Sequence, residues 1–395
     1  MKRVLGRILA ALLCALLLTV ACSSAAPAAK VELTSAHAGE VVAINDDVLS
    51  AYLAMPVGES LTYLKENAYK KTDAAHDGQE IVLSWTGGEA PYTVRIADNE
   101  AMTGAEAWTT DKMRLPVGIF LPDTSYWWSV TDAKGNTSEI GTFRTGTGVR
   151  VITARKTLKA DGVRNVRDLG GYKTADGKTV RYAMVYRGGL LLFPSGGSVY
   201  SKNIIDDFGL DALNRLHIQT ELDLRNDTDC GGQGYSPLDG CSYVRHTFTG
   251  YTSIFPDAIW FDERTPESMH SIFSLLAKPE SYPVYFHCLI GQDRTGTLAY
   301  LLLGLLGVEY EDILRDYELT AFSPVGNMNR EASFNYSGEK TVTQEKAFEA
   351  LHERMLQYSE NGVLSEAVEN YLTTVCGVSA DEIASIRAIL LTDAQ

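Results

Sequence analysis

Residues 283–307, PVYFHCLIGQDRTGTLAYLLLGLLG, decide how the larger part of this 395-residue chain is expected to fold. An apolar run leads into Cys288, a short polar loop containing Gly291 follows, and Arg294 precedes a leucine-rich segment. A strand, a tight loop and a helix N-terminus in this order form a cradle for phosphate groups. The stretch therefore predicts an anion-binding loop between a strand and a buried helix.

The C-x5-R spacing of Cys288 and Arg294 adds the chemistry of phosphate transfer to that cradle. An arginine fork can bind two phosphate oxygens at once, and a helix N-terminus contributes about half a positive charge. The same positive field favours the thiolate of Cys288, which is the form of cysteine that attacks phosphorus. The loop therefore predicts a nucleophile as well as a binding site.

Several segments, in one order along the chain, resemble motifs of a known family. The loop HCLIGQDRTG resembles the H-C-x-x-G-K-D-R-T-G loop of the bacterial tyrosine-phosphatase-like family, which has atypical and sometimes lipid-accepting specificity. Upstream, NVRDLGGYKTADGKTVRYAMVYRGG and LDLRND resemble its N-terminal motif and its D-L-R strand. Downstream, DYELTAFS and VENYLTTVCGVSADEIASIRAILL resemble its closing helices. Over residues 150–395 the resemblance implies the cysteine-phosphatase fold and a phosphocysteine intermediate.

The resemblance also implies a role for each residue of the loop. Cys288 is the nucleophile, and Arg294 binds phosphate and stabilises the transition state. Asp293 matches the loop aspartate that serves as general acid and then as base for water, and the hydroxyl of Thr295 stabilises the departing sulfur. We expect His287 to order the loop by hydrogen bonding and not to act as the base.

A second residue competes for the role of general acid. Asp257 lies in an FPD segment upstream of Cys288, and this segment resembles the mobile acid loop of ordinary tyrosine phosphatases. The alternative is a surface turn, because Pro-Asp pairs favour turns.

The expected substrate-binding residues come from the loop, the RDLGG turn and the end of the LDLR strand. A turn-capping role is the alternative for Asp168. Gln292 stands where the related loops have lysine, and the absence of that positive charge weakens the case for a phosphoinositide substrate. The candidates are Leu289, Ile290, Gly291, Gln292, Asn165, Arg167, Asp168, Asp223 and Arg225.

Strand-like and helix-like segments alternate over residues 150–395, which predicts an α/β domain with a central, mostly parallel sheet flanked by helices. The expected strands lie within 179–188, 219–225, 242–248 and 283–288. The expected helices cover 266–278, 294–306, 309–322, 343–359, 363–375 and 379–391.

Residues 77–147 read as an all-β domain, with alternating apolar and polar positions between turns. They resemble a fibronectin type III or similar immunoglobulin-like β-sandwich. The resemblance rests on Trp85 and on the corner around Tyr126, whose hydroxyl is expected to reach back to the backbone. Trp127 and Trp128 are expected to be rim and core residues of the sandwich, with a carbohydrate platform as the alternative.

The N-terminus has the pattern of an export signal. Residues 1–21 combine a basic start with an apolar run, and TVAC resembles the lipobox that precedes a lipidated cysteine, here Cys22. The alternative is a plain secretory signal. Residues 22–76 are expected to form a tether and a helical segment interrupted at Pro56. The expected location is the extracytoplasmic face of a bacterial membrane, anchored by lipid.

Export makes a disulfide conceivable. Cys230 and Cys241 flank the glycine-rich loop CGGQGYSPLDGC and are either bridged or two free thiols. The net charge of −15 excludes a general attraction for nucleic acid. The residues imply no metal or organic cofactor, because arginine and backbone amides can hold the phosphate.

The sequence therefore predicts an exported phosphomonoester hydrolase, either a protein-tyrosine or a dual-specificity phosphatase. Its partner is a phosphorylated protein or a small phosphomonoester, and its only membrane contact is the N-terminal lipid. The alternative substrates are inositol polyphosphates or phosphoinositides, which favour a broad basic surface that this chain lacks. A surface binding protein with an inactive phosphatase domain is the alternative of another class.

Overall fold

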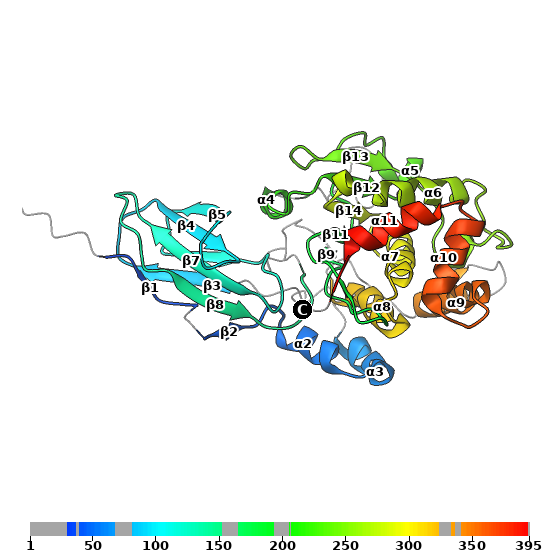
Figure 1. Cartoon of the computed structure of the whole chain (residues 1–395), viewed down its shortest axis with the longest axis horizontal. Helices are drawn as coiled ribbons and strands as arrows, with labels where there is room; N and C mark the ends of the chain where they lie inside the picture. The colour runs from blue at the N-terminus through cyan, green and yellow to red at the C-terminus, as the bar shows by residue number, and fades with distance from the viewer. Residues whose placement is uncertain are drawn as a thin grey trace, which may run out of the picture. The chain divides into compact units, whose positions relative to one another are not determined.

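The computed structural model describes residues 30–36, 39–67, 81–151, 165–192, 205, 207–323, 333–335 and 341–393 (Figure 1). The chain divides into two compact units. Of the described residues, the first unit contains those within 30–42, 82–116 and 125–144, and the second contains those within 43–81, 117–124 and 145–393. The predicted signal segment and Cys22 lie outside the described residues.

The first unit contains two sheets, in which the pairs β1–β3, β4–β5, β4–β7 and β7–β8 are antiparallel. Buried and exposed residues alternate along β3, as expected for strands with one face in a core. Trp85 and Trp128 are buried and Trp127 is half-buried, so the tryptophan pair is divided between core and rim. The likeness to fibronectin type III stays a prediction. The sheets have the orders β1 (Glu32–Leu33), β3 (Ile81–Thr86), β6 (Arg114–Val117) and β2 (Val41–Val42), β8 (Gly141–Thr145), β7 (Ser125–Thr131), β4 (Tyr92–Ala97), β5 (Glu106–Thr110).

The second unit is built on a five-stranded sheet, and its mixed α/β character confirms the predicted fold class. Four strands run parallel, and only the edge strand β9 is antiparallel to its neighbour. The three inner strands are buried along their whole length, which is typical of a parallel sheet covered on both faces. The order is β13 (Ser242–Arg245), β12 (Thr220–Asp223), β14 (Val284–His287), β11 (Val185–Gly188), β9 (Arg167–Asp168).

The strand register brings three strand ends to one level. His287, the last residue of β14, pairs with Gly188 of β11 on one side and with Asp223 of β12 on the other. The chain leaves β14 at Cys288 and enters helix α7 (Asp293–Leu305). Every residue of α7 from Thr295 to Leu305 is buried, which accounts for its nearly continuous apolar sequence. The loop therefore lies at the carboxyl edge of the sheet, where α/β folds bind ligands.

The six predicted helices of this unit are present within a few residues of their expected bounds (Figure 1). Two short helices, α4 and α5, were not predicted, because so few residues carry no clear periodicity. Two small antiparallel pairs, β10 (Thr179–Val180) with β17 (Leu391–Thr392) and β15 (Ser333–Asn335) with β16 (Thr341–Thr343), complete the unit. The helices are α4 (Asp207–Asn214), α5 (Asp227–Cys230), α6 (Thr265–Leu276), α7, α8 (Tyr310–Glu318), α9 (Gln344–Met355), α10 (Leu364–Thr374) and α11 (Ala380–Leu390), with the 3-10 turns η1 (Tyr251–Ile254), η2 (Pro279–Ser281), η3 (Leu319–Phe322) and η4 (Leu356–Tyr358).

The helical segment predicted before the β domain also packs within the second unit. It forms α2 (Asp47–Ala54) and α3 (Val57–Asn67), separated next to Pro56. The hydroxyl of Tyr52 donates to Oε2 of Glu318 at 2.5 Å, and its ring packs against Phe322. The first β unit thus interrupts the second unit in sequence. Within the described ranges, no helix is both long and apolar enough to cross a membrane.

Candidate active site

The loop that follows β14 has its carbonyl groups bound from outside. Nδ1 of His287 lies 3.0 Å from the carbonyl oxygen of Cys288, and the amide of Leu190 donates to the carbonyl oxygen of Leu289 at 3.2 Å. The side-chain amide of Asn165 donates to the carbonyl of Ile290 at 3.0 Å.

The second half of the loop is bound in the same way. The carbonyl of Gly291 accepts from Nη2 of Arg187 at 2.9 Å and from Asn165 at 3.2 Å. The carbonyl of Gln292 accepts from the amide of Gly296 at 2.7 Å. A peptide unit whose oxygen points outward directs the following N–H the opposite way.

The backbone amides of the loop are therefore the groups left to meet a ligand. Within the described part of the chain, no acceptor binds the N–H groups of Leu289, Ile290, Gly291, Gln292 and Arg294. Several amides that converge in a turn and lie next to a helix N-terminus make an anion-binding nest. Cys288, at the start of this loop, is 2% exposed.

Gly291 is required by both conformation and space. Its φ is +75°, in the left-handed region that side chains disfavour. A Cβ there would lie 2.5 Å from the carbonyl carbon and oxygen of Gly188 and 2.9 Å from Nδ2 of Asn165. The end of β11 thus packs directly against the turn of the loop.

Arg294 is oriented by two neighbours at the end of the sheet. Its Nη2 lies 2.7 Å from Oδ2 of Asp229 in α5, and its Nη1 donates to the carbonyl of Leu224 at 3.2 Å. The side chains of Arg294 and Asp229 are 16% and 24% exposed, so the pair is only partly screened by water. A guanidinium has five N–H donors, and further donors remain for phosphate oxygens.

The structure brings Asp293, and not Asp257, to the loop. Asp293 is the first residue of α7, and its Oδ1 accepts from the hydroxyl of Tyr251 at 2.5 Å. Asp257 instead forms an ion pair with Arg354 of α9, and its side chain is 79% exposed. Among the interactions of the described residues, none joins Asp257 to the loop. The geometry therefore favours Asp293 as the general acid.

His287 stabilises the loop by hydrogen bonding. Besides its contact with Cys288, its Nε2 lies 3.0 Å from Oε1 of Glu221 in β12. Both ring nitrogens thus face acceptors inside the protein, and the residue is fully buried. No ring nitrogen is left to take a proton from a substrate, in agreement with the predicted ordering role.

Asn165 and Arg167, which we predicted to contact substrate, instead support the loop from behind. Nε of Arg167 lies 2.8 Å from Oδ1 of Asp316, and its Nη1 donates to Oδ1 of Asn165 at 2.7 Å. Arg187 also pairs with Asp316. Burial alone would raise the pKa of Asp316, but the two arginines hold it below its usual value. This buried network fixes Asn165 and Arg187 on the loop carbonyls.

The other polar candidates are also buried and bound within the protein. Oδ1 and Oδ2 of Asp168 accept from the amides of Gly170 and Ala183 at 2.7 and 2.8 Å, so the turn-capping alternative holds. Asp223 and Arg225 are fully buried and pair with each other at 2.7 Å. The expectation that these three side chains contact substrate is wrong, because each one is already satisfied inside the protein.

Two loop side chains turn inward. Gln292 is fully buried, and its Nε2 donates to the hydroxyl of Tyr317 at 3.4 Å. Its side chain is therefore not a substrate ligand, and only its backbone amide remains a candidate. Thr295 is also fully buried, and its Oγ1 has no partner among the described atoms. A buried hydroxyl without a partner is unusual, and it fits the predicted role beside the sulfur.

Several supporting residues were not anticipated from the sequence. Arg187, Asp316, Glu221, Asp229 and Tyr251 hold the loop, its arginine or its aspartate. The first two lie within motifs that carry the family resemblance, which was the available signal. The others could be found only by folding, because they are remote in sequence from the groups they contact.

The two cysteines considered for a disulfide are free thiols. The thiol of Cys230 donates a hydrogen bond to the carbonyl oxygen of Asp227 at 3.4 Å, and the thiol of Cys241 donates one to the carbonyl oxygen of Ser242 at 3.6 Å. Each thiol thus contacts the backbone of its own segment. Among the described residues, no three His, Cys, Asp or Glu side chains gather closely enough to hold a metal ion.

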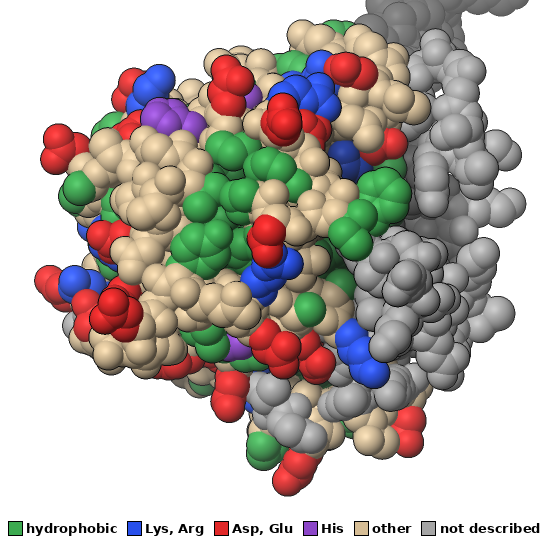
Figure 2. All heavy atoms as spheres, turned by 90° about the vertical axis from the view of Figure 1, so that its right-hand side faces the viewer, with side chains coloured by type: hydrophobic (Ala, Val, Ile, Leu, Met, Phe, Trp, Pro, Cys, Tyr) green, Lys and Arg blue, Asp and Glu red, His purple; other side chains and the backbone are tan. Residues whose placement is uncertain are grey.

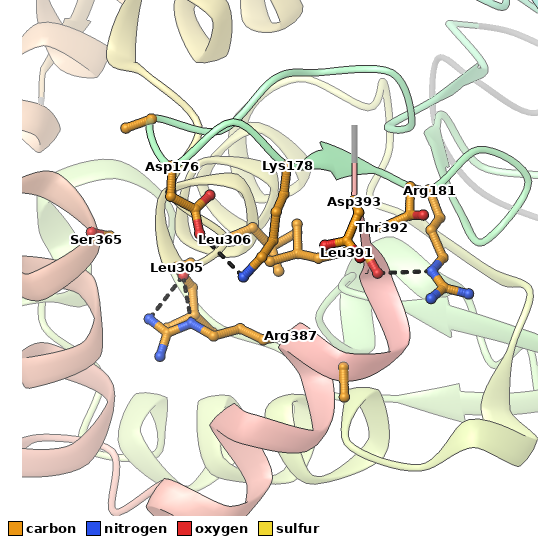
Figure 3. A pocket seen from close by; sticks show the side chains of 13 residues that line it. Asp176, Lys178, Arg181, Leu305, Leu306, Ser365, Arg387, Leu391, Thr392 and Asp393 are labelled. Atoms are coloured by element: carbon orange, nitrogen blue, oxygen red, sulfur yellow. Dashed lines mark hydrogen bonds and ion pairs between the residues drawn. The ribbon is translucent and has the colours of Figure 1, made fainter. Parts of the chain in front are cut away.

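A pocket of about 520 Å³ lies at the other end of α7 and is separate from the loop (Figure 3). Lys178, Arg181 and Arg387 line it, but each already has an acceptor. Arg387 donates to the carbonyl of Leu305 at 3.1 Å, at the negative end of the helix dipole. Lys178 pairs with Asp176 at 3.1 Å, and Arg181 binds a backbone carbonyl. Each of these cations is thus already bound within the protein.

The fold and the loop define a phosphatase, an enzyme of the hydrolase class. The family model described as "Tyrosine phosphatase family" matches residues 158–392, and the chain belongs to that family. This match confirms the predicted enzyme class, and it covers the described residues that build the loop and its supports.

Individual relatives are distant. A tyrosine-protein phosphatase of Nostoc commune is 26% identical over 210 residues, which cover 47% of this chain and 70% of the relative. A protein of Cupriavidus necator, provisionally named a tyrosine-protein phosphatase, is 28% identical over 180 residues, which cover 42% of this chain and 63% of the relative, less than two thirds of its length. The core catalytic domain of the PP-IP phosphatase SIW14 from S. cerevisiae, solved with citrate, matches with a TM-score of 0.26 and 14% identity over 45% of this chain and 89% of that one.

Proposed function

We propose that this chain is an exported protein-tyrosine phosphatase that works through a phosphocysteine on Cys288. One observation carries the proposal. Each carbonyl from Cys288 to Gln292 has a hydrogen-bond partner, which leaves the loop amides and Arg294 to hold a phosphate dianion next to the sulfur. Such a site gains most from a single, tightly held phosphate group.

The reaction proceeds in two displacements. The thiolate of Cys288 attacks phosphorus as the bond to the ester oxygen breaks, and Asp293 gives its proton to that oxygen. Water then attacks the phosphocysteine, Asp293 takes a proton from the water, and the phosphorus–sulfur bond breaks to restore the thiolate. Arg294 and the loop amides stabilise the charge that develops on the equatorial oxygens in both steps.

The charge of the chain supports a simple phosphomonoester over a polyphosphate. The net charge is −15, and two further arginines of the second unit, Arg245 and Arg264, are paired with Asp227 and Asp262. On the face drawn in Figure 2, acidic and basic side chains are interspersed and form no continuous basic area. This charge balance disfavours inositol polyphosphates, which carry several negative groups and favour a broad basic surface.

A substrate panel tests the proposal. The wild type is offered a phosphotyrosine peptide, a phosphoserine peptide, phytate and an aryl phosphate, and Cys288→Ser serves as a substrate trap. Cys376→Ser is a matched control, since Cys376 is another buried thiol and burial raises its pKa to about 12. We expect Cys288→Ser alone to abolish turnover, with the phosphotyrosine peptide preferred. Turnover of phytate above that of the peptide, or activity in Cys288→Ser, would refute the proposal.

Export and lipid anchoring are proposed from the sequence of residues 1–22 alone. Expression of the full chain in a bacterium fed with labelled palmitate tests them. Label in the wild type and not in Cys22→Ala supports an anchor at that cysteine. Unlabelled protein in the cytoplasmic fraction would contradict both export and anchoring.

A further inference from the structure

We propose that Tyr251 is a positioning residue for Asp293, and that it acts at the end of a buried chain of hydrogen bonds that begins at Gln292. The inference deepens the proposed function, because it rests on Asp293 as the general acid. It assigns a role to three buried side chains outside the groups that touch phosphate.

The chain of hydrogen bonds runs from the loop back to the loop. Nε2 of Gln292 donates to the hydroxyl of Tyr317 at 3.4 Å. The hydroxyls of Tyr317 and Tyr251 are 2.6 Å apart, and that of Tyr251 lies 2.5 Å from Oδ1 of Asp293. Gln292 and Tyr251 are fully buried and Tyr317 is 1% exposed, so water does not compete for these bonds.

The donors in this chain all point the same way. A carboxylate oxygen only accepts, so the hydroxyl of Tyr251 must donate to Asp293. Its own oxygen then accepts from the hydroxyl of Tyr317, whose oxygen accepts from Gln292. Bonds that run in one direction polarise one another and strengthen the last bond, the one to Asp293. An amide at position 292 starts such a chain without placing a charge beside the carboxylate.

The backbone of Tyr251 is held in place for this contact. Its φ is +56°, a left-handed conformation that is uncommon for a bulky residue and is often found at functional sites. Its amide donates to Oγ1 of Thr297 at 2.8 Å. A Cβ on Gly250 would lie 3.2 Å from the carbonyl carbon of Asp293. The turn η1 thus lies directly against the first turn of α7, where the catalytic aspartate begins.

The hydroxyl of Tyr251 orients the carboxylate of Asp293 by donating to Oδ1. The charged and titratable groups that face this pair include Tyr251 from η1, Tyr317 from α8 and Arg187 from β11, whose charge acts on Tyr317. Cys288 and Arg294 lie in the same loop.

Loss of the hydrogen bond from Tyr251 should shift the pH dependence of kcat in one direction. A hydrogen bond from Tyr251 favours the charged form of Asp293. Without it, Asp293 keeps its proton to higher pH, and the descending limb of kcat, where the acid is lost, moves upward. The carboxyl group also loses its orientation, so substrates that need protonation of the leaving oxygen suffer most.

The experiment compares Tyr251→Phe and Tyr317→Phe with the wild type across pH, using phenyl phosphate and p-nitrophenyl phosphate. Tyr300→Phe is a matched control, since Tyr300 is a buried tyrosine of α7 whose hydroxyl pairs with His352 and not with this chain. We expect Tyr251→Phe to lower kcat for phenyl phosphate about ten-fold or more and to affect the nitro compound far less. The descending limb of the kcat–pH profile of Tyr251→Phe moves to higher pH. Tyr317→Phe shows a smaller shift in the same direction, and Tyr300→Phe shows no shift.

Other results overturn the inference. If Tyr251→Phe lowers both substrates by one factor, or leaves the limb in place, the tyrosine only stabilises the fold. If Tyr251→Phe does not fold, Tyr317→Phe becomes the deciding variant. An unshifted descending limb of its kcat–pH profile would then reject the proposed series of hydrogen bonds. Asp293→Asn separates the two levels of the argument: if it leaves the difference between the two substrates unchanged, the general acid is misassigned and the proposed function fails on that point.

Discussion

Nη2 of Arg294 lies 2.7 Å from Oδ2 of Asp229, so the arginine that we propose to bind phosphate is held by a carboxylate on the short helix α5. Asp229 lies in the segment after β12, and the same segment supplies the carbonyl of Leu224 that binds Nη1. The guanidinium is therefore oriented before a phosphate arrives, which lowers the entropy lost on binding.

The first prediction follows from that contact. Asp229→Asn keeps the shape of the side chain but removes the charge that orients Arg294. We expect kcat/KM to fall about ten-fold, and the inhibition constant for vanadate to rise, because Arg294 samples more rotamers. Asp227→Asn is the matched control, since this neighbour on α5 pairs with Arg245 instead. Equal effects of the two variants would show that α5 matters only for its fold or charge.

The second prediction concerns the loop glycine. Gly291→Ala places a Cβ in the backbone of Gly188 and in a left-handed conformation, so the loop must shift, and we expect activity to fall at least 100-fold, about 3 kcal/mol of transition-state stabilisation. Gly232→Ala is the control, because that glycine has a φ of +85° and no atom within 4 Å of the added Cβ. It should lose about 1 kcal/mol of stability and keep full activity. An active Gly291→Ala enzyme would contradict the proposed geometry of the nest.

The third prediction is a dependence of stability on pH. The pKa of Asp316 is below its usual value, against the effect of burial, because Arg167 and Arg187 favour its charged form. A lowered folded-state pKa gives stability that is present above the unfolded value of about 3.9 and is lost as pH falls through the folded value. Asp316→Asn should remove this dependence and lower the free energy of unfolding at pH 7 by about 3–5 kcal/mol, because two buried arginines lose their counter-ion.

Urea unfolding at pH 7 and pH 3 measures that dependence. The wild type should lose more stability between the two values than Asp316→Asn does. Asp176→Asn is the control, since Asp176 forms a surface ion pair with Lys178 and both side chains are largely exposed. A variant as sensitive to acid as the wild type would show that the network is not held by this charge.

The fourth prediction tests the docking of α2. The hydroxyl of Tyr52 donates to the buried carboxylate of Glu318 at 2.5 Å, and Glu318 follows the site residues Asp316 and Tyr317 in α8. Tyr52→Phe should lower the free energy of unfolding of the second unit by about 1–3 kcal/mol. Tyr63→Phe, which removes a bond to the carbonyl of Val48, should have a smaller effect. No change in the unfolding midpoint of Tyr52→Phe would mean that α2 is not a structural part of this unit.

The sequence alone was enough to place the loop, the central parallel sheet and six of the helices. Those features depend on local signals: apolar runs for buried strands, helical periodicity, and the C-x5-R spacing of Cys288 and Arg294. A nucleophile, its arginine and the glycine between them are neighbours along the chain, so their chemistry can be inferred before any folding. The two predicted halves of the interrupted helical segment also followed from a local signal, Pro56.

Only the tertiary structure decided what surrounds the loop. Sequence order could not show that Asp229 binds Arg294, that Tyr251 binds Asp293, or that Asp257 turns to Arg354. It also could not show that Arg167, Asp223 and Arg225 are buried and paired inside the protein. The sequence of a motif is the same whether its charged residue faces a ligand or a buried partner. Such pairings depend on which strand ends and helices the fold brings together, and that is set by the packing of the whole unit.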